Sequence, residues 1–214
     1  MTNLTRRAML GGVAAGLTAT AGCLDVITGE EPLEFSSEPA TVPESTLDST
    51  GYELVDEESP TVSQEFSAAG QTREVEVTNQ VATYEKAVDL GPLGSVRAAM
   101  FAVFTTPQIE IAGRTFNPIG EMSNRELLQE MASRYDGLTI GDEVGSTEVQ
   151  TLGKTATVTR YEATATVDGQ EVPIYLLLSR LQHGEDFVVT VGGYPRQLTE
   201  EESNMYTLIE NVEH

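Results

Sequence analysis

Apolar and polar residues alternate along residues 73–85. Val75, Val77 and Val81 fall on one side of an extended chain, and glutamate, threonine and glutamine residues fall on the other. An alternation with a period of two predicts a β-strand with one buried and one solvated face. Asn79 interrupts the apolar row of this strand.

Residues 96–105 are mainly apolar on both sides of an extended chain. Met100 and Phe104 share one side, while Phe101 and Val103 share the other. Two apolar sides are typical of a strand at the centre of a sheet that is covered on both faces. We therefore expect a central strand here.

The clearest hairpin lies in residues 154–181. Asp168 and Gly169 form a strong two-residue turn signal, and a loop of this length sets the register of the flanking strands. The predicted facing pairs are Ala165 with Val172, Ala163 with Ile174, Tyr161 with Leu176, and Thr159 with Leu178. Most of these residues are apolar, so this face is expected to meet the core. A further strand is predicted over residues 186–194.

Two helices are predicted from their first turns. Ser123 and Glu126 form a capping box, and Thr199 and Glu202 form a second one. Apolar residues at helical spacing follow: Leu127, Leu128, Met131 and Tyr135 up to Gly137, and later Met205, Leu208, Ile209 and Val212. The predicted fold class is α+β: an antiparallel β-sheet with one or two packed helices, including a C-terminal helix, in a single domain over residues 33–214.

The N-terminus is typical of an export signal. Arg6 and Arg7 directly precede residues 8–22, which carry no charge and contain four glycines. This apolar run is shorter than the roughly 20 residues that a membrane-spanning helix needs. Paired arginines before such a run indicate the twin-arginine export route. We predict a twin-arginine lipoprotein signal peptide over residues 1–22.

Cys23 is the only cysteine of the chain, so it cannot form an internal disulfide. The residues before it, Thr20, Ala21 and Gly22, resemble a lipobox, with threonine where leucine is usual. The lipobox implies that Cys23 becomes the mature N-terminus and carries a lipid. An uncleaved membrane anchor and a buried cysteine are the alternatives. Residues 23–32 are predicted to be an acidic tether that holds the domain to the extracytoplasmic face of the cell membrane.

The chain is strongly acidic, with 34 acidic and 12 basic residues and a formal net charge of -22. Nucleic acid is excluded as a partner, because phosphate binding needs a basic patch. Surplus carboxylates with few lysines indicate adaptation to high salt, since salt screens the self-repulsion of such a surface. Binding of cations such as calcium is the alternative interpretation.

No catalytic or metal-ligating pattern stands out in the sequence. His183 lies in a predicted turn and His214 is the last residue, so both are expected to be solvated rather than metal ligands. Neither an EF-hand loop, nor a phosphate-binding loop, nor a Gly-x-Ser-x-Gly elbow occurs. We therefore expect no cofactor and no metal, and we assign no catalytic residue.

The scarce arginines suggest one further candidate site. Arg160 and Glu162 share a strand face, and Arg180 lies on the partner strand, where the three side chains could anchor an anionic ligand. Pairing with the surplus surface carboxylates is the favoured alternative. The stretch Gly192–Pro195 is interpreted as the end of a strand rather than as a ligand loop.

Several stretches resemble a haloarchaeal lipoprotein family with twin-arginine signals and a domain of unknown function. They are TGYEL, VTNQVATYEK, FTTPQIEIAGRTFNPIGEMSNRELL, DFVVTVGGYP and LIENVEH, together with the opening motif. This resemblance implies export, a lipid anchor and a high-salt exterior, and it implies no activity. The order of predicted elements is also similar to the PsbP-like fold.

Two classes of function follow from these observations. The first is a non-enzymatic binding or assembly module on a haloarchaeal cell surface, anchored to the membrane through Cys23 and contacting an envelope or membrane protein. The second is an extracellular hydrolase that acts through carboxylates or His183. A small-solute-binding lipoprotein is a third possibility. A large exposed apolar patch favours the first class, and a deep pocket with perturbed carboxylates favours the second.

Overall fold

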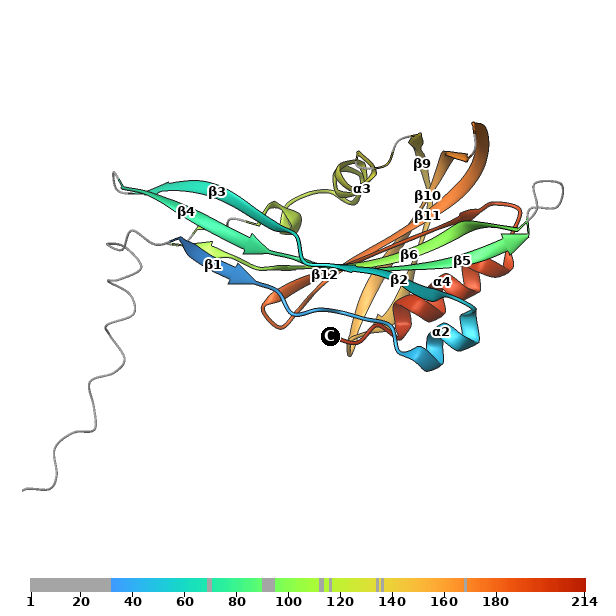
Figure 1. Cartoon of the computed structure of the whole chain (residues 1–214), viewed down its shortest axis with the longest axis horizontal. Helices are drawn as coiled ribbons and strands as arrows, with labels where there is room; N and C mark the ends of the chain where they lie inside the picture. Colours follow the sequence, from blue (N-terminus) through green and yellow to red (C-terminus); the bar gives the residue numbers. More distant parts are fainter. Residues whose placement is uncertain are drawn as a thin grey trace, which may run out of the picture.

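The computed structural model shows a protein built around one seven-stranded antiparallel sheet (Figure 1). The structure describes residues 32–68, 71–89, 95–111, 114–115, 117–133, 135, 137–167 and 169–214. The strands of this sheet, in spatial order, are β2 (Glu53–Glu58), β5 (Gln80–Asp89), β6 (Ser95–Pro107), β12 (Asp186–Pro195), β11 (Gln170–His183), β10 (Lys154–Val167) and β9 (Leu138–Thr151).

A second sheet of three strands extends from one end of the large sheet (Figure 1). Its strands are β1 (Leu33–Ser36), β4 (Gln71–Thr78) and β3 (Thr61–Ala68), with β4 in the middle. The single strand predicted over residues 73–85 is therefore wrong, because β4 and β5 belong to different sheets. The break falls at Asn79, whose backbone N–H donates to the carbonyl of Pro60 at 3.0 Å. We call this three-stranded sheet the small sheet, and a separate hairpin pairs β7 (Glu110–Ile111) with β8 (Arg114–Thr115).

Helices lie on both faces of the large sheet (Figure 1). On one face, α2 (Glu44–Thr50) and α4 (Glu200–Glu210) contact each other and cover a core that includes Tyr84, Phe101 and Met205. On the opposite face, α3 (Asn124–Ala132) places Leu127 and Leu128 in a second core with Tyr161, Leu176 and Leu178. A 3-10 turn, Pro118–Gly120, precedes α3. The sheet is thus the middle layer between two apolar cores.

The predicted hairpin and central strand are confirmed. All four predicted facing pairs occur in the register of β10 with β11, and Val167 pairs with Gln170 across the turn. β6 lies inside the sheet between β5 and β12. Its Phe101 and Val103 enter the core under α4, while Phe104 packs into the core on the side of α3.

The predicted fold class is wrong. The described residues form mostly β-strands, in two main sheets and a small hairpin, with three short α-helices. β2 was not predicted because it is an edge strand that is exposed along its whole length, and so it carries no pattern of buried residues. α2 was missed because its seven residues, between Pro43 and the left-handed Gly51, are too few to show an apolar periodicity. Of the strands that the sequence did not predict, β9 and β3 are the longest, at 14 and 8 residues, and they add most of the extra β-structure.

The two predicted capping boxes have different outcomes. At α3 the box is confirmed, because Ser123 and Glu126 bond reciprocally. At α4 the side chain of Thr199 makes no capping hydrogen bond, so that prediction is wrong. The three glutamates in the first turn of α4 still interact favourably with the positive end of the helix dipole. α3 also ends earlier than predicted, at Ala132, so Tyr135 lies beyond the helix.

Candidate functional site

A cavity lies between α3 and the large sheet, and we call it the α3 pocket. Its volume is about 230 Å³. Strands β6, β10, β11 and β12 form most of its floor, and α3 with the residues after it forms the opposite wall. The lining residues are Met100, Ala102, Leu128, Met131, Ala132, Tyr135, Gly137, Leu138, Ala165, Thr166, Val167, Val172, Ile174, Leu176, Val191, Gly193 and Pro195.

Small residues on the floor of the α3 pocket leave the space above them empty. Ala102, Ala165 and Gly193 lie on three different strands where larger side chains would fill the space. A Cβ atom on Gly193 would approach Leu176 Cδ2 to 3.1 Å. The stretch that was interpreted as a strand end, Gly192–Pro195, therefore contributes Gly193 and Pro195 to the pocket.

The wall formed by α3 is fixed at its N-terminal end. Ser123 Oγ accepts from the backbone N–H of Glu126 at 3.2 Å, and the Glu126 carboxylate accepts from the Ser123 backbone N–H at 2.8 Å. The Ser123 hydroxyl also donates to this carboxylate at 2.7 Å, and the hydrogen bonds that the carboxylate accepts from the Ser123 side chain and backbone N–H lower the pKa of Glu126 below its usual value. From the sheet, Arg180 donates to the carbonyls of Ile119 and Met122 just before the helix. The cap and this arginine together hold α3 over the sheet.

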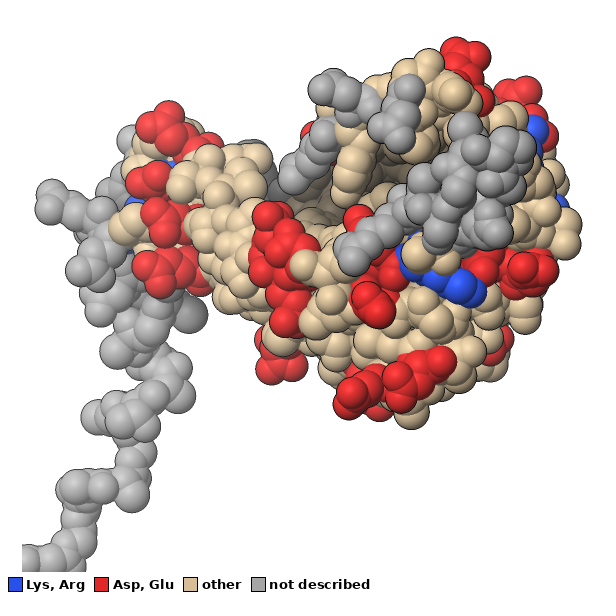
Figure 2. Space-filling model, turned by 45° about the vertical axis from the view of Figure 1, so that its right-hand side comes forward, with Lys and Arg blue, Asp and Glu red and all other residues tan. Residues whose placement is uncertain are grey.

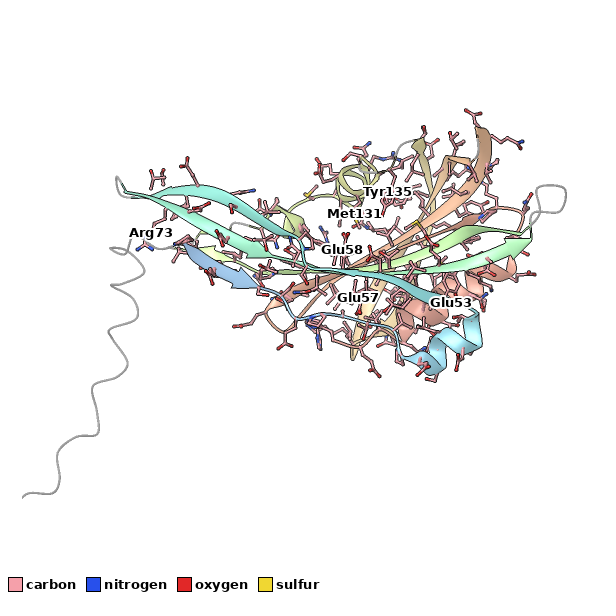
Figure 3. The ribbon with its side chains drawn as sticks, in the orientation of Figure 1. Glu53, Glu57, Glu58, Arg73, Met131 and Tyr135 are labelled. Carbon is pink, nitrogen blue, oxygen red and sulfur yellow. The ribbon has the colours of Figure 1, made fainter. Side chains whose placement is uncertain are left out.

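The opposite end of α3 is more open. Tyr135 is 51% exposed although it lines the pocket, and Met131 is half-buried. Figure 3 places both residues on the side of the sheet that carries α3, and it places Glu53, Glu57 and Glu58 along the edge strand β2 and Arg73 on the small sheet. Figure 2 shows a hollow on the molecular surface with Asp and Glu side chains near its border.

The chemistry of the α3 pocket is almost wholly apolar. The hydroxyls of Tyr135 and Thr166 are the polar side-chain groups among its described lining residues, which include no charged side chain. Such a wall can hold apolar surface through the hydrophobic effect. It offers no carboxylate or imidazole for acid–base chemistry, so the hydrolase hypothesis finds no support in this pocket.

Outside the α3 pocket, a polar cluster brings together the two histidines, which the sequence predicts to be solvated. His183 Nδ1 and His214 Nδ1 lie 2.8 Å apart, and His214 Nε2 lies 3.2 Å from Asp186 Oδ2. The same Asp186 oxygen accepts from the backbone N–H of Glu38 at 2.9 Å. The side chain of His214 is only 5% exposed, so the prediction of a solvated residue is wrong for it. No group of three potential metal ligands with suitable geometry occurs among the described residues.

Another polar cluster is buried between α2, β5 and α4. The carboxylate of Glu201 is 3% exposed and accepts from Lys86 Nζ at 2.6 Å and from Tyr52 Oη at 3.1 Å. Burial raises the pKa of Tyr52, and the neighbouring Glu201 charge raises it further. Tyr52 belongs to the first core, and none of these three residues lines the α3 pocket, so we interpret the cluster as structural.

The arginine candidates do not form one site. Arg160 pairs with Glu202 of α4, and Glu162 pairs with Arg196 at 2.9 Å. Arg180 points to the opposite face of the sheet, where it bonds the backbone before α3. The anion site considered from the sequence is therefore not assembled, because neighbouring positions along β10 and β11 alternate between the two faces.

The predicted export and lipidation residues Arg6, Arg7 and Cys23 lie outside the described residues. None of the helices in the described part of the chain has the length and apolar composition needed to cross a membrane. The lipid anchor and the twin-arginine signal therefore remain predictions.

The described chain is thus a mostly β protein with an apolar pocket between its sheet and one short helix. Residues 39–213 match the family described as Domain of unknown function (DUF6517), so the chain belongs to this family. A search of curated proteins finds no match.

Two solved structures show a distant similarity. The solution structure of cyanobacterial PsbP (CyanoP) from Synechocystis sp. PCC 6803 is 9% identical, with a TM-score of 0.41 over 82% of this chain and 91% of that one. The crystal structure of the protein of unknown function PA94 from Pseudomonas aeruginosa, a putative regulator, is 10% identical, with a TM-score of 0.32 over 66% of this chain and 88% of that one.

Proposed function

We propose that this protein is a membrane-anchored lipoprotein of a haloarchaeal cell surface that acts as a non-enzymatic binding or assembly module. Arg6 and Arg7 direct its export, and a lipid on Cys23 holds it at the extracytoplasmic face of the membrane. The net charge of -22 supports a salt-rich exterior. The α3 pocket is the recognition site of the module.

The α3 pocket is the observation that carries this proposal. Apolar surface that leaves water contributes about 25 cal/mol per Å² to binding. The pocket offers such surface with no charged side chain that would have to lose its hydration. Its volume of about 230 Å³ is below the roughly 300–1,000 Å³ of ordinary ligand pockets, so it takes only part of a larger molecule.

The proposal is tested by photo-cross-linking on intact cells at their native salt concentration. A photoreactive residue replaces Met131 in the pocket wall, and a matched control carries it at Val62, which is 44% exposed on the small sheet. We expect one adduct from position 131 that is absent from position 62 and is lost when Ala165→Phe fills the pocket. Equal adducts from both positions would refute the pocket as the recognition site.

The membrane anchor is tested in the same cells. We expect the protein to stay with the membrane fraction and Cys23→Ser to release it, with mass spectrometry showing a lipidated peptide that begins at Cys23. A wild-type protein that is cleaved before Cys23 but carries no lipid there, or that is not cleaved before Cys23, would contradict the anchor.

A further inference from the structure

The four strands that form most of the floor of the α3 pocket offer no free edge to which a peptide backbone can bond. The floor strands β6, β12, β11 and β10 all lie inside the sheet and have a neighbour on each side. Their backbone N–H and C=O groups are therefore used within the sheet, and no free edge remains there for an added strand. A peptide inserted into the pocket would bury its own amide groups without partners, which is costly.

A hydrocarbon chain has no such groups. It needs only apolar contact, which aliphatic residues such as Leu128, Val172, Ile174 and Leu176 supply. An enclosed apolar cavity of about 150 Å³ is already large enough to stay dry and bind benzene or xenon. The α3 pocket is larger, at about 230 Å³, and it reaches the surface beside the exposed ring of Tyr135.

The charge of the ligand is restricted as well. The described lining residues include no cation that could pair with a carboxylate or phosphate. On the face that Figure 2 shows, Asp and Glu side chains outnumber Lys and Arg side chains, so an anionic head group gains no general attraction from this surface. An uncharged molecule needs neither a paired cation nor such an attraction.

We propose that the α3 pocket binds the hydrocarbon chain of a neutral lipid or other uncharged amphiphile, an inference that rests on the proposed function and names its ligand class. The hydrocarbon chain of the ligand lies against Ala102, Ala165 and Gly193 on the floor. The uncharged head group of the ligand lies at the opening beside Tyr135. The small floor residues are thus the part of the sequence that makes room for the ligand.

The experiment uses the full chain with Cys23→Ser, which has no attachment point for a lipid of its own. The probes are 1-decanol and decanoate, which share a chain length and differ in charge. Binding is measured by calorimetric titration in high salt and by NMR of the methionine methyl groups. Met100 and Met131 line the pocket, whereas Met205 is buried in the core on the other face and serves as the internal control.

We expect 1-decanol to bind with shifts at Met100 and Met131 but not at Met205, and decanoate to bind about tenfold or more weakly because of its charge. Ala165→Phe should abolish binding, and Ala87→Phe, which adds the same ring at an exposed position on β5, should leave it unchanged. The wild-type methyl shifts test the proposal even if Ala165→Phe does not fold. No binding of 1-decanol, shifts outside the pocket, or unchanged binding by folded Ala165→Phe would each overturn it.

Flotation with vesicles of an uncharged, bilayer-forming glycolipid separates two sources of the bound hydrocarbon chain. If the Ala87→Phe control floats and Ala165→Phe does not, the bound hydrocarbon chain belongs to a membrane lipid. If 1-decanol binds but no variant floats, the hydrocarbon chain belongs to a free amphiphile. If 1-decanol does not bind but the pocket-specific cross-link forms on cells, the ligand class is wrong and the binding module stands. If both are absent, the proposed function fails too.

Discussion

The buried ion pair of Lys86 and Glu201 allows a sharp test of the energetics of this fold. Lys86 Nζ lies 2.6 Å from the Glu201 carboxylate, and the two side chains are 22% and 3% exposed. Lys86→Met keeps most of the aliphatic stem but leaves the carboxylate buried without its cation. Removal of one partner from a buried pair costs about 3–5 kcal/mol. Since Lys86 is partly solvated, we expect a loss near the lower end, about 3 kcal/mol.

The matched control is an exposed pair on the same face of the sheet. Arg196 and Glu162 lie 2.9 Å apart, but their side chains are 31% and 39% exposed. Glu162→Gln should therefore cost only about 0–1 kcal/mol. Adding Glu201→Gln to Lys86→Met should restore most of the lost stability, because the amide carries no charge and can still accept from Tyr52.

The assay is urea unfolding followed by far-UV circular dichroism, since the chain contains no tryptophan. Measurements at two salt concentrations distinguish the buried ion pair from the exposed one, because salt screens exposed charges more than buried ones. The loss in Lys86→Met should persist at high salt. A loss below about 1 kcal/mol, equal to that of the exposed control, would refute the claim that Glu201 is held inside as a paired charge.

Two further predictions concern the core under α4. Gly192→Ala should destabilise the protein by about 1–3 kcal/mol in the same assay, because its Cβ would lie 2.4 Å from Met205 Sδ and overpack the core. The cost should fall in the double variant with Met205→Leu, and equal costs would contradict the contact. Burial is the main cause that raises the pKa of both Tyr84 and Tyr194 above 10.0. The unfolded chain then loses these protons first, so the free energy of unfolding should fall as the pH rises above 10. A stability that stays constant to pH 11 would contradict this, and ultraviolet titration of the native protein should show both phenols still protonated above pH 10.

Local signals in the sequence predicted the elements that depend on neighbouring residues. Asp168 and Gly169 determine a two-residue turn, and that turn set every facing pair of the β10–β11 hairpin. Ser123 and Glu126 likewise marked the start of α3, since a capping box is completed within four residues. The two apolar sides of β6 identified a central strand, because a strand between two cores buries both of its sides.

The candidate site could not be predicted in the same way. The α3 pocket depends on Ala102, Ala165 and Gly193, which are ordinary strand residues until β6, β12, β11 and β10 align in this order beneath a helix. Each is a small residue in an apolar segment, which is a weak signal by itself. His183 and His214 are 31 residues apart and meet only because the C-terminus lies against the turn between β11 and β12.

By itself, the sequence determined the acidic surface, the hairpin, the central strand and the start of α3, since composition and short-range bonds decide these features. It also predicts the export signal and the lipid anchor. The tertiary structure alone decided that β4 and β5 separate at Asn79 into two sheets, that α2 exists, and that space remains between α3 and the sheet. These features depend on long-range pairing and on the packing of side chains from distant segments, neither of which leaves a periodic pattern along the chain.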